Sequence, residues 1–416
     1  MSKTLIVVGG GAAGFFCAVN AARLHPGLRC ILLEKSNKFL SKVKVSGGGR
    51  CNVTHACYII DDMIKNYPRG SHFLKKSFHQ FFTTDTIQWL AERGVQLKTE
   101  PDGRMFPISN QSQTIIDCLF SEANRYHVET RLQADVKKIE ISQPSEDAGG
   151  NKFRVHLAGS TPLESDFVCL ATGGYPKSSM FDWIRELGHT IEPPVPSLFT
   201  FNMPGHPVTK LMGVSVPDVL VNIRDTGLSE RGPLLITHWG MSGPVVLRLS
   251  AWGAREMASR QYRFTAVVNW LPEFREHTLA EKLKQLQAAQ GSQKMDGRNP
   301  FDLPQRLWIH QLSQAGINEN TRWADLLAAA RNRLVKELCT QAYEVTGKTT
   351  FKEEFVTAGG IRLSEIDPHT MQSRKIPGLY LAGEIMDVDG ITGGFNFQHA
   401  WTSGFLAAKA IAASTS

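Results

Sequence analysis

Residues 4–14, TLIVVGGGAAG, and the later stretch CILLE at residues 30–34 decide the fold. A continuous apolar run that ends in glycine is typical of a buried parallel strand, so we expect strands over 4–8 and 30–33. Small residues open a helix over 12–24 between them. Short connections join the three elements, as in a βαβ unit. The sequence therefore predicts an α/β fold that begins with a Rossmann-like nucleotide-binding unit.

The glycines of the first turn carry the chemistry of this unit. Gly9, Gly11 and Gly14 fit the pattern GxGxxG. The first permits a tight turn, the second lets a pyrophosphate approach the backbone, and the third lets helix pack on strand. Glu34 ends the second strand, 20 residues after Gly14, where a carboxylate accepts hydrogen bonds from ribose hydroxyls. An acid at this place disfavours a 2′-phosphate, which indicates FAD or NAD rather than NADP.

The composition is that of an ordinary globular protein of two or three domains, with 416 residues, 42% apolar and 20% charged. Seven scattered cysteines show no CxxC spacing, so we expect neither a zinc ribbon nor a redox dithiol, and no metal site. A reducing, cytoplasmic location fits this cysteine usage best. No apolar run reaches the roughly 18 residues of a membrane-spanning helix, so no membrane association is expected.

The charge balance is mildly basic, with a formal net charge of +7. For a chain of this length, such a bias fits an anionic ligand such as a dinucleotide and does not by itself argue for nucleic acid. We therefore expect a small-molecule substrate and regard nucleic acid as an improbable partner. The sequence makes no choice of oligomeric state.

Changes in composition divide the chain. A turn-rich segment at 144–151 separates two alternating stretches and predicts a β-hairpin. Proline density rises over 193–207, which marks the passage into a second domain. We expect a nucleotide-binding domain over residues 1–194 and 350–416, and an inserted domain over 195–349 that is β-rich over 195–274 and helical over 275–349.

Four further segments identify the family that the chain resembles. They are SGGGRCNVT at 46–54, ATGG at 171–174, THWGMSGP at 237–244, and a tail that contains GLYLAGEIMDVDGITGGFNFQHAWTSG. Together they resemble the BaiN/YhiN-type, or aminoacetone-oxidase-like, bacterial NAD(P)/FAD-dependent oxidoreductases. The resemblance implies a discontinuous FAD domain of the glutathione-reductase type, with an inserted β-barrel-like and helical domain. It also implies non-covalent FAD.

The resemblance and the glycine pattern together imply the residues that hold FAD. Arg50 would offer charge to a phosphate, and Cys51 would lie either near the flavin or as a structural thiol. Glu384 would hold a ribityl hydroxyl or one linked to the pyrophosphate. Backbone N–H groups at the start of the last helix would stabilise the reduced flavin. The expected ligands are Gly9, Gly11, Ala12, Ala13, Gly14, Glu34, Lys35, Ser46, Gly47, Gly48, Arg50, Cys51, Asn52, Ala171, Thr172, Gly173, Gly383, Glu384, Gly394, Phe395 and Asn396.

The reaction is less defined than the cofactor. No general acid or base stands out, and His238 and His399 are weak candidates that are each more typical of structural histidines. No second GxGxxG is present, so NAD(P)H would act as a transient donor. We expect NAD(P)H-linked reduction of a small unsaturated carbonyl compound. Oxidation of a small amine such as an amino ketone, an RNA-directed flavoprotein and a non-catalytic FAD-binding protein remain open.

Overall fold

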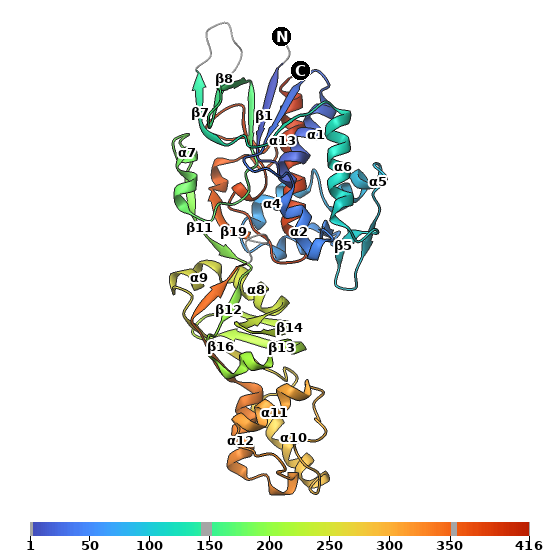
Figure 1. Cartoon of the computed structure of the whole chain (residues 1–416), viewed down its shortest axis with the longest axis vertical. Coiled ribbons are helices and arrows are strands. Elements are labelled where there is room, and N and C mark those ends of the chain that lie inside the picture. The colour runs from blue at the N-terminus through green and yellow to red at the C-terminus, as the bar shows by residue number, and fades with distance from the viewer. Residues whose placement is uncertain (1–2, 143–151, 351–355, 416) are drawn as a thin grey trace. The chain divides into compact units, whose positions relative to one another are not determined.

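The computed structural model describes residues 3–142, 152–350 and 356–415 (Figure 1). The chain divides into two compact units. Unit 1 comprises Met1–Ser197 and Phe351–Ser416, and unit 2 comprises Leu198–Thr350. The turn expected at 144–151 lies outside the described residues, whereas the strands on either side of it pair in an antiparallel hairpin.

Unit 1 is built on a five-stranded parallel sheet with the order β20-β10-β1-β2-β6. Its central strands are apolar along almost their whole length because helices cover both faces of such a sheet. The first βαβ unit is confirmed, with β1 and β2 on either side of helix α1 (Ala12–Leu24). The strands are β1 (Thr4–Val8), β2 (Arg29–Leu33), β6 (Glu129–Arg131), β10 (Phe167–Leu170) and β20 (Leu379–Leu381).

The first and last helices of unit 1 pack against each other, although nearly the whole chain separates them in sequence (Figure 1). Helix α13 (Phe395–Ala413) carries Gly404 at the contact. A Cβ atom there would lie 2.6 Å from the Ala13 carbonyl oxygen of α1. The other helices of unit 1 are α2 (Ser41–Gly49), α3 (Ile60–Met63), α4 (Ser71–Phe78), α5 (Thr83–Ala91), α6 (Ser112–Arg125) and α7 (Asp182–Arg185).

Three small antiparallel sheets complete unit 1. Strand β11 ends where the chain leaves unit 1, and β19 lies just after the chain returns to it. The two strands pair with each other. The sheets are β3 (Thr54–His55), β5 (Arg104–Pro107) and β4 (Leu97–Thr99); β7 (Val136–Ser142), β8 (Lys152–Leu157) and β9 (Leu163–Ser165); and β11 (Ile191–Ser197) with β19 (Val356–Ile361).

Unit 2 contains a seven-stranded antiparallel sheet with the order β17-β16-β13-β14-β15-β12-β18. Its two edge strands follow each other in the chain with only Thr346 between them, so the sheet curls toward closure as the barrel-like prediction requires. The strands are β12 (Thr200–Asn202), β13 (Ser215–Ile223), β14 (Ser229–Thr237), β15 (Gly240–Ser242), β16 (Phe264–Asn269), β17 (Gln341–Val345) and β18 (Gly347–Thr349).

Two details of the inserted domain differ from the prediction. The expected helical part over 275–349 is wrong at its end, because β17 and β18 return to the sheet and bury alternate residues of QAYEV. The expected β-rich part is interrupted by two helices, the first of which starts at Pro244, a residue that favours the first helical turn. The helices of unit 2 are α8 (Pro244–Trp252), α9 (Ala254–Ser259), α10 (Glu276–Ala289), α11 (Gln305–Gln314) and α12 (Ala328–Cys339).

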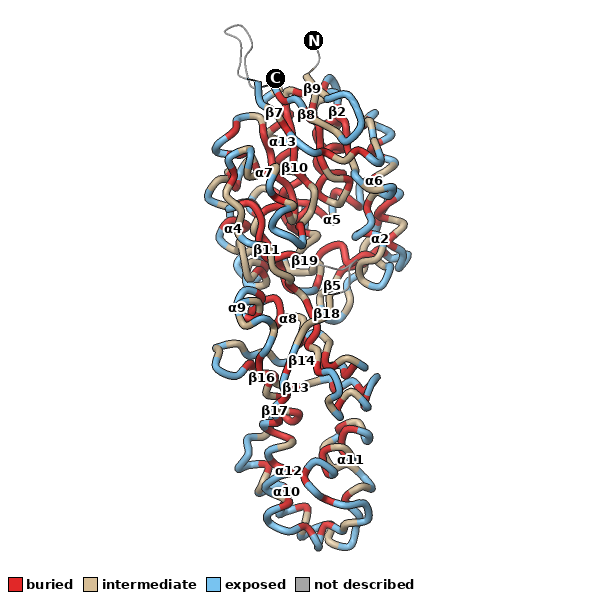
Figure 2. Tube along the Cα trace, turned by 60° about the vertical axis from the view of Figure 1, so that its left-hand side comes forward, coloured by how far each residue is buried: buried red, intermediate tan, exposed pale blue. Residues whose placement is uncertain are grey.

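Each unit has its own buried interior. In unit 1, buried residues follow β10 and α13 (Figure 2). In unit 2, the core includes the fully buried Trp270, Trp308 and Trp323. The nucleotide-binding unit therefore rests on a core that is separate from the core of the insert.

The contact at Gly404 yields the first prediction. An alanine in place of a helical glycine ordinarily stabilises a protein by about 1 kcal/mol. In Gly404→Ala, the new methyl group would instead meet backbone atoms of Ala13 and Cys17 at 2.6 and 3.2 Å. We expect a loss of about 1–3 kcal/mol in the free energy of unfolding, seen as a lower melting temperature. Gly227→Ala is the control, because its Cβ meets no atom within 4 Å. A stabilised Gly404→Ala variant would contradict the close packing of α1 and α13.

Candidate functional site

The turn between β1 and α1 is held by two glycines that the packing of unit 1 requires. Gly9 has φ +116°, and its N–H donates to the Leu33 carbonyl at 2.8 Å. A Cβ at Gly9 would lie 2.3 Å from the Ala171 carbonyl oxygen, and one at Gly14 would lie 1.9 Å from the Gly9 carbonyl oxygen. Side chains at these positions are therefore excluded by the protein itself.

Gly11 differs from its two neighbours in the pattern. Its φ is −88°, which any residue adopts, and a Cβ there would meet nothing within 4 Å. The residue is the N-cap of α1, and no side chain caps this helix end. The first N–H groups of a helix have no partner within the helix, and the helix dipole favours an anion in front of them. The space at Gly11 and the free helix end suit a phosphate group.

Glu34 lies at the end of β2 and faces the same turn. Its carboxylate accepts hydrogen bonds from the Gly10 N–H at 2.9 Å and from the Ser36 N–H at 2.8 Å, one at each oxygen. Each oxygen keeps a second lone pair that can accept a hydroxyl. The neighbouring Lys35 is exposed, and its ammonium lies over the Tyr175 ring at 5.5 Å.

The SGGGRCN segment forms an irregular turn with unusual backbone conformations. Gly47 and Gly48 are left-handed, and Gly49 also has a positive φ. A Cβ at Gly48 or Gly49 would meet nothing within 4 Å. The Ser46 hydroxyl donates to the Val43 carbonyl at 3.1 Å, which fixes the start of the turn. Open backbone of this kind allows a ligand to approach closely.

The charged and polar side chains of this segment have partners or burial within the protein. The Arg50 guanidinium pairs with Glu100 at 2.5 Å and stacks on the Phe106 ring at 4.0 Å, so its charge is already compensated. Burial raises the pKa of the Cys51 thiol to about 12, which keeps this side chain protonated and inert. The Asn52 side chain accepts from the Gly394 N–H at 2.9 Å and donates to the Thr54 carbonyl at 3.1 Å. These contacts hold the segment in its irregular conformation, and the expected contacts of its residues with FAD stay predictions.

A second group of residues gathers where β10 and β20 end and β19 begins. Gly173 has φ +75°, and a Cβ there would meet nothing within 4 Å, as at Gly11. The Glu384 carboxylate accepts from the Thr357 N–H at 2.8 Å and pairs with the Lys42 ammonium at 2.6 Å. A Cβ at Gly174 would lie 2.8 Å from this carboxylate. Glu384 thus joins three segments of unit 1, and its expected contact with a cofactor hydroxyl stays a prediction.

The loop Gly390–Asn396 leads into α13 and is closed by its own side chains. The Asn396 side chain accepts from the Gly390 N–H at 2.8 Å and donates to the Gly390 carbonyl at 2.9 Å. The Tyr67 hydroxyl donates to the Phe395 carbonyl at 2.7 Å. Gly394, with φ +95°, is the N-cap of α13. The helix therefore presents its first N–H groups at a rigid end.

Sequence reasoning missed two neighbours of this loop. Arg69 forms a two-pronged pair with the fully buried Asp389, which also accepts from the Ser197 hydroxyl at 2.8 Å. Burial raises the pKa of the Asp389 carboxyl, and Arg69 opposes this effect. His55 stacks on Phe395 at 4.7 Å and contacts the Gly393 carbonyl at 3.0 Å. The only sequence signal for His55 was its place directly after the SGGGRCN segment.

The two candidate histidines have different surroundings. His238 belongs to unit 2, between β14 and β15, where it packs edge-on against Trp239 at 4.4 Å. His399 is buried in α13, and its Nε2 lies 3.2 Å from the Gly383 carbonyl. Burial lowers the pKa of His399 to about 4, so the ring is neutral at physiological pH. The neutral His399 ring contacts the backbone at Gly383, and a catalytic role for either histidine stays a prediction.

Across residues 3–142, 152–350 and 356–415, no group of three or more His, Cys, Asp or Glu side chains is arranged to hold a metal ion. In the same ranges, no helix combines the length and apolar character needed to cross a membrane.

The fold and the open glycine turns define a Rossmann-type flavoprotein. The model for the HI0933-like protein Rossmann domain matches residues 3–410. The chain belongs to this family of FAD-dependent oxidoreductases, which confirms the resemblance read from its motifs and the predicted fold class.

Two relatives match almost end to end. The ribosomal RNA dihydrouridine synthase of Escherichia coli K12 is 30% identical, with 99% of this chain and 98% of the relative covered. The 3-dehydro-bile acid delta(4,6)-reductase of Clostridium scindens is 29% identical, with 98% of each covered.

Solved structures share the fold at lower identity. A flavocytochrome c3 fumarate reductase in its open conformation aligns with a TM-score of 0.51 and 17% identity, covering 99% of this chain and 78% of the other. The 3-ketosteroid delta1-dehydrogenase from Sterolibacterium denitrificans aligns with a TM-score of 0.51 and 15% identity, covering 99% and 100%. Likenesses at these identities show the fold alone.

The contrast between the glycines of the first turn yields the second prediction. Gly11→Ala should fold with a melting temperature close to that of the wild type, because its methyl group meets no protein atom. It should purify with little bound FAD, because the methyl group takes the space of a pyrophosphate. Gly14→Ala is the comparison and should fail to fold stably, since its Cβ would lie 1.9 Å from a carbonyl oxygen. A Gly11→Ala protein that keeps its full yellow colour would place the pyrophosphate elsewhere.

The third prediction concerns His399 and acid stability. The pKa of a histidine in an unfolded chain is about 6.5, whereas folding lowers that of His399 to about 4. Between these two pH values His399 is protonated in the unfolded chain and neutral in the folded chain. The free energy of unfolding therefore falls as the pH drops. His399→Gln should show a shallower fall of melting temperature between about pH 6.5 and pH 4 than the wild type. Parallel pH curves for the two proteins would mean that His399 is not buried as a neutral ring.

Proposed function

We propose that FAD lies across the open glycine turns of unit 1. Its pyrophosphate would face Gly11, Ala12 and Ala13 at the N-terminus of α1, and its adenosine ribose would lie against Glu34. The support is the contrast within the first turn: packing explains Gly9 and Gly14, whereas no protein atom occupies the space beside Gly11 at the open N-terminus of α1, which leaves room for a phosphate. Bound FAD would supply hydride chemistry, with the protein providing orientation and access.

The opposite end of the cofactor would lie near Gly48, Gly173 and the start of α13. The open backbone at the two glycines lets a flat ring approach. The first N–H groups of α13 would stabilise negative charge on the reduced ring through the helix dipole. Asn52 and Tyr67 hold this helix end in place through Gly394 and Phe395, so the positive end is preorganised before the flavin is reduced.

The reaction that we propose is NAD(P)H-linked reduction of a carbon–carbon double bond conjugated to a carbonyl. Its main support is that two relatives of nearly equal identity have names that describe different substrates and one chemistry. Dihydrouridine arises when hydrogen adds across the ring double bond of uracil that is conjugated to a carbonyl. A 3-dehydro-delta(4,6) bile acid likewise has a ketone conjugated to ring double bonds. In both, hydrogen adds across a carbon–carbon double bond conjugated to a carbonyl, with the hydride expected at a carbon made electron-poor by that conjugation and a proton at its neighbour.

A uracil base in structured RNA is a second candidate substrate, and the charge distribution favours it over the small ketone. Residues 198–350 contain 18 Lys and Arg against 13 Asp and Glu, so the insert carries +5 of the formal net charge of +7. A basic domain attached to a flavin domain suits a polyanionic substrate. This candidate revises the expectation that nucleic acid is an improbable partner.

The fourth prediction tests the reaction in two halves. Under anaerobic conditions, NADH or NADPH should bleach the flavin absorbance near 450 nm. The reduced enzyme should then be reoxidised by its substrate, and a steroid-type dienone and an unmodified ribosomal RNA transcript are the two probes. Dihydrouridine in the RNA, or the saturated ketone, identifies the substrate class. No bleaching by either nucleotide, together with oxygen consumption on an amino ketone, would overturn the proposal in favour of an oxidase.

A further inference from the structure

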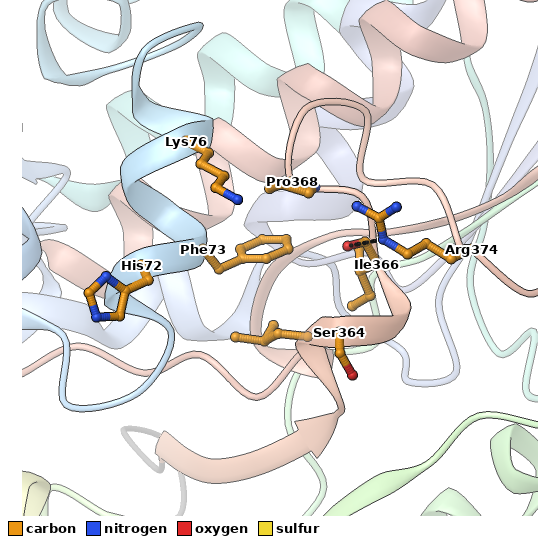
Figure 3. Close-up of a pocket in the computed structure, with 8 residues that line it drawn as sticks. His72, Phe73, Lys76, Ser364, Ile366, Pro368 and Arg374 are labelled. Atoms are coloured by element: carbon orange, nitrogen blue, oxygen red, sulfur yellow. Dashed lines mark hydrogen bonds between the residues drawn. The ribbon is translucent and has the colours of Figure 1, made fainter.

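Unit 1 contains a surface pocket that the proposed FAD site does not use. It has a volume of about 320 Å³ and lies between α4 and the segment 363–374 (Figure 3). Phe73, Ile366 and Pro368 supply an apolar lining. The rings of Phe73 and Pro368 come from separate segments and lie on the same hollow, as the close-up shows. Such a lining suits a flat, weakly polar ring.

Basic side chains surround this apolar lining. Lys76 and Arg374 extend along the pocket from its two walls, and His72 lies at its edge (Figure 3). No Asp or Glu lines the pocket. The Arg374 Nε donates to the Ile366 carbonyl at 3.3 Å, and its guanidinium lies 3.4 Å from the nearby Asp367 carboxylate. The Lys76 ammonium forms no ion pair with any of the described residues. Lys76 therefore supplies positive charge that no described carboxylate balances, and Arg374 adds N–H donors, a combination that suits a phosphate.

The pocket is connected through the chain to the loop before α13. Helix α4 begins directly after Gly70, where a Cβ would lie 2.6 Å from the Val388 side chain. The preceding Arg69 pairs with Asp389 of the same loop. That loop continues to Gly394, the N-cap of α13, where we propose that the flavin ring lies. The N-terminal end of α4 thus contacts the same loop that leads to the proposed flavin site.

We propose that this pocket binds the phosphate-bearing adenosine end of NADPH. The adenine ring would lie on Phe73 and Pro368, and the 2′-phosphate would lie between Lys76 and Arg374. The inference rests on the proposed NAD(P)H linkage and names the site of the donor. It also separates two nucleotide sites by charge: the carboxylate of Glu34 repels a 2′-phosphate, whereas this pocket attracts one.

The fifth prediction uses the flavin-loaded protein and adenosine 2′,5′-bisphosphate as the probe, with binding measured by calorimetry. Lys76→Ala should weaken binding about tenfold, because one charged hydrogen bond to the phosphate is lost. Lys75→Ala is the matched control on the same helix, since Lys75 pairs with Asp61 at 2.5 Å and does not line the pocket. The control should bind the probe as the wild type does. In flavin bleaching, Lys76→Ala should raise the KM for NADPH by a similar factor and leave that for NADH unchanged.

Equal binding of the probe by wild type and Lys76→Ala, or an unchanged KM for NADPH, would contradict the assignment of the pocket to the adenosine end of NADPH. The proposed function would be left intact. Inorganic phosphate that competes as well as the bisphosphate would reduce the pocket to a simple anion site and overturn its nucleoside part. Probe binding that depends on Lys76, without bleaching by NADPH, would support a nucleotide site there and overturn its assignment to the electron donor. The two proposals therefore fail in different measurements.

Discussion

Close approach of backbone to backbone at Gly9, Gly14 and Gly404 is the constraint on which unit 1 depends. Gly9 lets the first turn lie against Ala171 at the end of β10, and Gly14 lets α1 begin directly beneath that turn. Gly404 brings the last helix against the first. Because interiors are close-packed, one added methyl group at these contacts must move a whole element. The termini of both helices are thereby fixed relative to the sheet.

The polar contacts of the site hold these closely packed turns and helices in place. Most of the charged side chains near the open turns already have partners, as Arg50 with Glu100 and Glu384 with Lys42 show. The groups that remain available are the N–H groups at two helix ends, the space beside glycines, and the unused lone pairs of Glu34. Such a site binds phosphate by preorganised dipoles rather than by flexible side chains. Buried pairs such as Arg69 with Asp389 hold the loops that frame it, and removal of one partner would leave an unpaired buried charge.

The sequence predicted those parts of the structure that local patterns encode. The first strand, helix and strand were predicted from an apolar run, three glycines and a second apolar run, and the structure confirms them. The ligand assignments, including Gly11 and Glu34, remain predictions until the cofactor is located.

Contacts between residues far apart in sequence could not be predicted from local patterns. Nothing in the sequence pairs Arg50 with Glu100 or Arg69 with Asp389, because these contacts depend on how the chain folds back. The strands at 341–349 were missed because a five-residue alternation is a weak signal beside the long helices that precede it.

The proposal on which the others depend is that unit 1 holds FAD without a covalent bond. The most direct test is to denature the purified protein, separate the released cofactor and identify it by chromatography and mass. We expect FAD in an amount close to equimolar with the chain. Release of FMN, or flavin that stays attached to the denatured chain, would contradict it.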